Sequence, residues 1–173
     1  MALYVASGQT GRFTGPGVDT PCGLGKAGVI EARDKSEGDG KSPIGQWSVR
    51  KAWYRPDRLN RPQSSLIFDA LGPRDGWCDD PDDAAYNRAI LRPYPASHEE
   101  MWRADGLYDL VVSLGHNDDP PVAGLGSAIF LHCAKYDDAG AIKPTLGCIS
   151  IDRAILSDLV TRLSPGDQIA IAP

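Results

Sequence analysis

Short apolar runs bounded by Gly, Pro or Asp recur along the whole chain. Runs of this length that are rich in β-branched residues and lie between turn residues are typical of β-strands. We expect strands at residues 3–6, 27–31, 45–49, 65–68, 110–114, 127–131 and 168–171. Seven short strands separated by frequent turns predict a sheet that packs as a sandwich or closes as a barrel.

Two other segments carry helix signals. Ser97 and Glu100 have the spacing of a capping box in front of the segment EEMWRADGLYDL, and Asp152 precedes RAILSDLVTRL as an N-cap. The second segment has one apolar face, made of Leu156, Leu159, Val160 and Leu163. The predicted fold class is therefore mainly β, with mixed sheets in a sandwich or barrel-like arrangement and about two short helices.

Composition narrows the class of protein. The chain has 173 residues, 42% of them hydrophobic and 24% charged, which fits one compact domain over residues 1–173. Its net charge of −5 and lack of clustered Lys and Arg exclude nucleic acid as the expected partner. No apolar run approaches 20 residues, so we expect no membrane span. The sequence gives no signal of an oligomeric state.

The start of the chain and its cysteines indicate a compartment. Met1 leads directly into ALYVASG, without the basic and long apolar regions of a signal peptide, so we expect a cytoplasmic protein, or a periplasmic one if a leader was removed. Four widely spaced cysteines are expected to remain thiols there: Cys22, Cys78, Cys133 and Cys148. None forms a Cys-x2-Cys pair, so no metal site is predicted.

The segment AIFLHCAKYDDAGAIKPTLGCISI carries the strongest chemical signal. His132 ends an apolar run and Cys148 follows Thr-Leu-Gly. A thiolate is a strong nucleophile, and an imidazole within reach is its usual activator. Gly147 permits a tight turn before the sulfur, and the amides around Cys148 are then expected to stabilise an oxyanion, Gly147 among them.

A second candidate region is acidic. Four aspartates follow Trp77-Cys78: Asp79, Asp80, Asp82 and Asp83. The ordinary interpretation is a solvated loop, and the alternative is a site for calcium or for a substrate ammonium group. Under that alternative Trp77, Tyr86 and Asn87 line a cleft and contact the substrate. His116 is a weaker candidate to approach the same cleft.

Taken with their order and spacing, these motifs resemble the YkuD-type L,D-transpeptidase family. The resemblance rests on His132 followed after twelve residues by Thr145-Leu-Gly-Cys148, and on KSEGDGKSPIGQW, where Ser42 stands in place of the usual threonine. GWCDDPDDAAYNR and MWRADGLYDLVVSLGHN resemble a short, single-domain branch of the family. The resemblance runs across most of the chain and implies the fold of that family.

The resemblance also implies roles for particular residues. Cys148 is the nucleophile, His132 the general base, and the main-chain carbonyl of Cys133 orients the imidazole. Thr145, Leu146 and Ser150 are expected to contact the substrate, but Leu146 and Ser150 depart from the family's usual histidine and arginine or asparagine. A substrate carboxylate must then meet another cation, for which the sequence offers Lys35, Arg50, Arg55 and Arg58, or backbone amides.

The implied substrate is a peptidoglycan tetrapeptide stem or muropeptide, cleaved between meso-diaminopimelate and D-alanine through a thioester, with no cofactor. Water as acceptor makes the protein an L,D-carboxypeptidase of wall recycling, which is our first expectation. An amine as acceptor makes it an L,D-transpeptidase that forms cross-links or exchanges D-amino acids. A further alternative is a non-catalytic module that binds stem peptides, or a thiol redox sensor built on Cys133 and Cys148.

Overall fold

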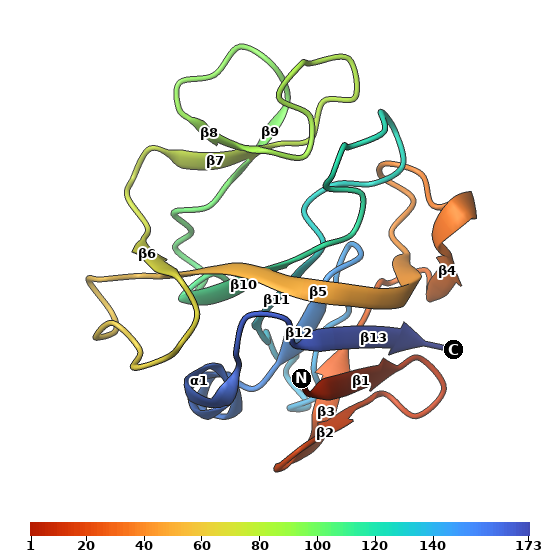
Figure 1. Ribbon diagram of the computed structural model, residues 1–173, viewed down its shortest axis with the longest axis vertical. Helices are drawn as coiled ribbons and strands as arrows, with labels where there is room; N and C mark the ends of the chain where they lie inside the picture. The colour runs from red at the N-terminus through yellow and green to blue at the C-terminus, as the bar shows by residue number, and fades with distance from the viewer.

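Thirteen β-strands, one α-helix and one 3-10 turn make up the computed structural model, which describes residues 1–173 (Figure 1). The strands are β1 (Leu3–Ser7), β2 (Arg12–Gly15), β3 (Val18–Gly23), β4 (Val29–Glu31), β5 (Ser42–Tyr54), β6 (Phe68–Ala70), β7 (Asp75–Cys78), β8 (Ala89–Leu91), β9 (His98–Glu100), β10 (Leu110–Leu114), β11 (Phe130–Cys133), β12 (Ile149–Ile151) and β13 (Gln168–Ala172). The 3-10 turn is η1 (Ala32–Asp34) and the helix is α1 (Arg153–Arg162). The prediction of a mainly β fold is confirmed.

Strand β5 closes the main sheet into a barrel-like structure. Nine strands of the ten-stranded sheet follow the order β10-β11-β12-β3-β2-β1-β13-β5-β4, and the tenth strand, β6, pairs with β5. Strand β5 also pairs a second time, with β10. The first half of β5 lies against β13 and its second half against β10, so one long strand joins both ends of the sheet. In Figure 1 it crosses the middle of the molecule, with β1 and β13 side by side below it.

The core fills the inside of this closed sheet. Buried side chains from β1, β5, β10, β11, β12 and β13 form one apolar cluster with the apolar face of α1. Asp152 accepts hydrogen bonds from the backbone amides of Ala154 and Ile155, as expected of an N-cap. The helix packs against β3, β10 and β11, and therefore supports the strand that carries His132. The predicted second helix is confirmed.

The first predicted helix is wrong. His98–Glu100 forms strand β9, which pairs with β7, and turns occupy the residues from 101 to 109. Glu100 pairs with Gly76 in this small sheet, and Gly106 has a φ of +82°, which breaks a helix. The apolar residues that suggested a helix are used differently, because Met101 and Tyr108 are buried in a second cluster around Trp53 and Phe130.

Two predicted strands are displaced, and a third is part of a longer strand. The run at 65–68 overlaps β6 only at Phe68, the run at 127–131 overlaps β11 only at Phe130 and Leu131, and the run at 45–49 is part of the longer β5. Ala128 has a φ of +52°, outside the range of a regular strand, so β11 begins after it. The remaining four predicted strands are β1, β4, β10 and β13, with small differences at their ends.

A separate sheet with the order β8-β7-β9 lies at one end of the molecule, at the top of Figure 1. Glu99 and Glu100 of β9, with Asp79 directly after β7, form part of the wall of the cavity described below. The chain has no helix of the length and apolar character needed to cross a bilayer.

Candidate active site

One cavity of about 660 Å³ contains both His132 and Cys148. His132 comes from β11, Cys148 directly precedes β12, and these two strands are parallel neighbours in the sheet. The pairing places the two side chains in one site although sixteen positions separate them in the sequence. The charged residues of the wall are Lys35, Glu37, Asp79, Glu99, Glu100, Arg103, Lys135 and Lys143.

His132 is held in one tautomer. Its Nδ1 lies 2.8 Å from the carbonyl oxygen of Cys133. Since a carbonyl only accepts, Nδ1 carries the proton and donates it, which leaves Nε2 of the neutral ring with its lone pair. Burial lowers the pKa of His132 to about 4. The imidazole is therefore neutral at physiological pH and able to accept a proton at Nε2.

Cys148 is held as a thiol. Its Sγ donates a hydrogen bond to the carbonyl oxygen of Ala128 at 3.0 Å, and no hydrogen bond joins it to His132. Burial raises the pKa of the Cys148 thiol to about 12, and the negative charge of Glu99 adds to this rise. The free protein thus holds a neutral thiol beside a neutral imidazole. The sulfur must leave Ala128 before His132 takes its proton.

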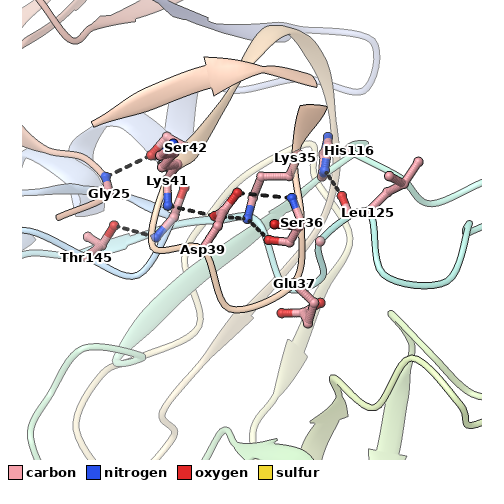
Figure 2. Close-up of polar contacts among 12 residues, drawn as sticks. Gly25, Lys35, Ser36, Glu37, Asp39, Lys41, Ser42, His116, Leu125 and Thr145 are labelled. Atoms are coloured by element: carbon pink, nitrogen blue, oxygen red, sulfur yellow. Dashed lines mark hydrogen bonds and ion pairs between the residues drawn. The ribbon is translucent and has the colours of Figure 1, made fainter. Parts of the chain in front are cut away.

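The nucleophile loop is fixed by the segment that contains Ser42. The Ser42 hydroxyl donates to the carbonyl of Gly147 at 2.8 Å and accepts from the amide of Gly25 at 2.9 Å. Figure 2 shows Ser42 beside Gly25. Gly147 has a φ of +148°, and an added Cβ would lie 3.0 Å from the carbonyl oxygen of Lys41. Two motifs that lie far apart in the sequence are therefore one structural unit around Cys148.

The expected oxyanion contact of Gly147 needs correction. The amide of Gly147 donates to Thr145 Oγ1 at 3.1 Å, and the same hydroxyl donates to the carbonyl of Cys148 at 2.7 Å. Thr145 therefore braces the turn, and the amide of Gly147 is occupied. The amide of Cys148 donates no hydrogen bond within the protein and is the donor left for an oxyanion.

Trp77, Tyr86 and Asn87 do not line the cavity, contrary to the expectation that they contact substrate. Asn87 Oδ1 accepts from the indole of Trp77 at 2.9 Å and from the amide of Ala128 at 3.0 Å. Asn87 thus holds the amide side of Ala128, the residue whose carbonyl accepts the hydrogen bond from the Cys148 thiol. Tyr86 donates to Glu37 at 2.5 Å and so ties the cavity wall to the neighbouring loop.

The cations expected to meet a carboxylate are engaged elsewhere. Arg50 pairs with Asp118 and Arg58 with Asp109, and neither lines the cavity. Arg55 is buried, pairs with Asp57 and stacks on Trp102, also away from the cavity. These arginines are structural, because each pairs with an acidic side chain and lies outside the cavity.

Lys35 does line the cavity, but it has an acidic partner. Its Nζ lies 2.6 Å from Asp39 Oδ1 and 2.9 Å from the carbonyl of Ser36. Figure 2 shows Lys35 beside Asp39 and Ser36. Burial alone would raise the pKa of the Asp39 carboxyl, but hydrogen bonds from Lys35 and from the amides of Ser36 and Lys41 lower it. This buried pair stabilises the loop beside Ser42.

Other sequence candidates have varied positions. Leu146 is 73% exposed at the rim of the cavity, whereas Ser150 is 1% exposed and lies inside its wall. His116 Nε2 donates to the carbonyl of Leu125 (Figure 2). The His116 ring packs edge-on against Trp47, and neither residue lines the cavity. Cys133 is buried, with its Sγ 3.7 Å from the carbonyl of Leu110.

The sequence did not indicate the group around Tyr108. The Tyr108 ring lies edge-on to His132 with centroids 5.3 Å apart, and its hydroxyl donates to Glu99 at 2.5 Å. Burial raises the pKa of the Glu99 carboxyl, whose other neighbour is Arg103 at 3.8 Å. The sequence analysis did not find the contact between Glu99 and Tyr108, because it placed both residues on a predicted helix instead of on one wall of the cavity.

The sequence analysis also did not identify Lys135 and Lys143 as residues of the cavity wall, although a turn sequence between them indicates that they are neighbours. They stand on either side of the turn Asp137-Asp138-Ala139-Gly140, and the amide of Lys143 donates to the carbonyl of Lys135 at 2.7 Å. Gly140 has a φ of +80°, which suits such a turn. The structure contains no group of three or more His, Cys, Asp or Glu side chains placed to hold a metal ion.

Comparison with known families agrees with the motifs. The chain matches the family model YkuD, described as the L,D-transpeptidase catalytic domain, over residues 1–171. No curated protein matches the chain.

Eight chains of solved structures match as well. They include an L,D-transpeptidase from Mycobacterium smegmatis, with 14% identity and a TM-score of 0.49 over 99% of this chain and 58% of that one. L,D-transpeptidase 3 from Mycobacterium tuberculosis, in complex with a faropenem-derived adduct, has 16% identity and a TM-score of 0.47 over 99% and 60%. The helical cell shape determining protein Pgp2 from Campylobacter jejuni has 13% identity and a TM-score of 0.48 over 98% and 46%. This chain thus spans about half to three fifths of their length.

Proposed function

We propose that this protein is a cysteine-dependent L,D-carboxypeptidase, on the premise that the chain belongs to the YkuD family of L,D-transpeptidase catalytic domains. The proposed substrate is a peptidoglycan tetrapeptide stem, and the bond cleaved joins the L-centre of meso-diaminopimelate to D-alanine. One observation carries the proposal. A thiol and an imidazole with a free Nε2 lone pair share a cavity that has charged groups of both signs on its wall.

The first half of the reaction forms a thioester. His132 Nε2 takes the proton of Cys148 as the sulfur attacks the scissile carbonyl carbon. The carbonyl π electrons move to oxygen, and the amide of Cys148 donates to this oxyanion. When the oxyanion collapses, the C–N bond breaks and the leaving nitrogen of D-alanine takes the proton from His132. Because the pKa values of Cys148 and His132 favour the neutral pair, proton transfer accompanies attack and does not precede it.

The second half releases the peptide. His132 removes a proton from water as the water oxygen attacks the thioester carbonyl, and collapse of this second oxyanion breaks the C–S bond. The sulfur then recovers its proton from His132, which restores the starting state. We propose water as the acceptor because one cavity of about 660 Å³ contains the whole site, and water needs no binding surface of its own. An amine acceptor would make the protein an L,D-transpeptidase through the same thioester.

The decisive experiment is mass spectrometry of L-Ala-γ-D-Glu-meso-diaminopimelyl-D-Ala after incubation with the wild type and with Cys148→Ala, each with and without D-methionine. Release of D-alanine by the wild type alone, with little D-methionine adduct, is the expected result. Abundant exchange product would identify a transpeptidase instead. An unchanged peptide in every tube would exclude both activities and favour a stem-peptide-binding module. A cytoplasmic site of action stays a prediction, which cell fractionation tests.

A further inference from the structure

Buried polar atoms without partners gather in the wall of this cavity. The protein has four such side-chain atoms: Asp79 Oδ1, His116 Nδ1, Ser127 Oγ and Ser150 Oγ. All except His116 belong to residues that line the cavity. A buried polar atom without a hydrogen bond is costly, so native proteins contain few of them. Their concentration here indicates that the cavity is built to give these atoms a polar ligand.

Ser150 carries one of these unpartnered atoms and is the strand partner of the catalytic base. It is 1% exposed, and it pairs in register with His132 across the parallel strands β11 and β12. Paired positions on adjacent strands are about 4.8 Å apart and direct their side chains to the same face of the sheet. The Ser150 hydroxyl is therefore next to the imidazole that protonates the leaving group.

Two unpaired cations lie at the same wall. Lys135 and Lys143 are neighbours across their turn, both are exposed, and neither forms an ion pair. The other cations of the cavity differ in this respect, because Lys35 pairs with Asp39 and Arg103 with Asp105. An added Cβ on Gly23 would lie 2.5 Å from Ser150 Oγ and 2.8 Å from the carbonyl oxygen of Lys143, so these two residues are close together.

We propose that Ser150, Lys143 and Lys135 bind the terminal carboxylate of the departing D-residue. This inference rests on the proposed function and names the subsite of that reaction. The leaving nitrogen takes its proton from His132, so the D-residue lies beside His132, and its carboxylate is only two bonds from that nitrogen. Ser150 donates its unpartnered hydroxyl hydrogen to the carboxylate, while the two lysines supply positive charge from the solvent side. The subsite therefore selects peptides with a free C-terminus.

Binding to a Cys148→Ala protein tests the subsite without requiring turnover. Calorimetry would compare the tetrapeptide with its C-terminal amide, which lacks only the terminal charge. We expect the free acid to bind about 10- to 100-fold more tightly, the ratio typical of a hydrogen-bonded charge. The double variant K135M/K143M should reduce this ratio to about 3-fold or less, and Ser150→Ala should reduce it in part. Lys26→Met removes another exposed lysine, one that does not line the cavity, so it should leave the ratio unchanged.

Three results would overturn the subsite: equal binding of acid and amide, a preference that survives in K135M/K143M, or binding of neither peptide. The exposed positions of both lysines make this variant safe for folding, which circular dichroism checks. Release of D-alanine by the wild type reports on the proposed function separately. If the wild type releases D-alanine but its preference for the free acid does not depend on the lysines, only the subsite is refuted. If the preference depends on the lysines but neither hydrolysis nor exchange occurs, only the proposed reaction is refuted.

Discussion

Replacing Ser42 by alanine would remove the one side chain that connects two distant segments beneath the nucleophile. Ser42 is completely buried, and its hydroxyl bonds to the amide of Gly25 and the carbonyl of Gly147. Ser42→Ala leaves both backbone groups without a partner. Since Gly147 directly precedes Cys148, the change loosens the turn that positions the sulfur. It also weakens the packing of the barrel next to this turn.

The magnitude follows from those two contacts. A buried donor or acceptor left without a partner costs about 1 to 3 kcal/mol, and two such groups whose costs partly overlap give about 2 to 4 kcal/mol. We therefore expect the free energy of unfolding to fall by about 2 to 4 kcal/mol, a large part of the stability of a domain of this size. We expect D-alanine release to fall by about tenfold or more, because a small displacement of the nucleophile weakens its alignment with the scissile carbonyl.

Urea denaturation followed by tryptophan fluorescence would measure the stability, and mass spectrometry would measure the release of D-alanine. Ser157→Ala is the matched control, since its hydroxyl lies on the exposed side of α1 and bonds only to the carbonyl of Arg153. It should change stability by no more than about 0.5 kcal/mol. Ser42→Thr keeps the hydroxyl and should fall between the wild type and Ser42→Ala. Stability and activity of Ser42→Ala equal to those of the control would refute the proposed role of this contact.

Three further predictions concern the titration and placement of the catalytic pair. Because burial raises the pKa of Cys148 to about 12, its alkylation by iodoacetamide, followed by peptide mapping, should rise about tenfold per pH unit from pH 7 to 10; a plateau below pH 8.5 would contradict this. The folded pKa of His132 is about 4, below its ordinary value, so the unfolded chain binds the proton first as pH falls from 6.5 to 4. The wild type should lose about 3 kcal/mol of stability more than His132→Gln over this window in urea titrations, and parallel curves would argue against it. Asn87→Ala deprives the Ala128 amide and the Trp77 indole of their acceptor, and should lower the unfolding free energy by about 2 to 4 kcal/mol; a loss below 0.5 kcal/mol in the same assay would show that the contact is dispensable.

Local patterns in the sequence were sufficient to predict several strands and the helix. Short apolar runs bounded by turn residues identified β1, β10 and β13, and Asp152 with the apolar face behind it identified α1. These features depend on neighbours within one strand or one helical turn, where side-chain direction follows directly from backbone geometry. The helix predicted at 97–110 was wrong because only local signals were used. The capping-box spacing is present, but residues 98–100 pair with β7, including Gly76 and Trp77, and form a strand. The short strands β2, β7, β8 and β12 carry too few residues for a pattern to be detected.

The sequence by itself determined which chemical groups were present: a nucleophilic sulfur, an imidazole, a glycine turn and the Ser42 motif. Only the tertiary structure decided their states. Burial made Cys148 a weak acid and His132 a weak base, and the partner of each cation depended on which acid the fold brought near it. Arg55, which the sequence offered as a ligand for a carboxylate, became structural, whereas Lys143, which the sequence analysis did not name, lines the cavity without an ion pair. Electrostatic interactions act through space between segments distant in sequence, so desolvation and ion pairing are fixed only when the barrel has closed.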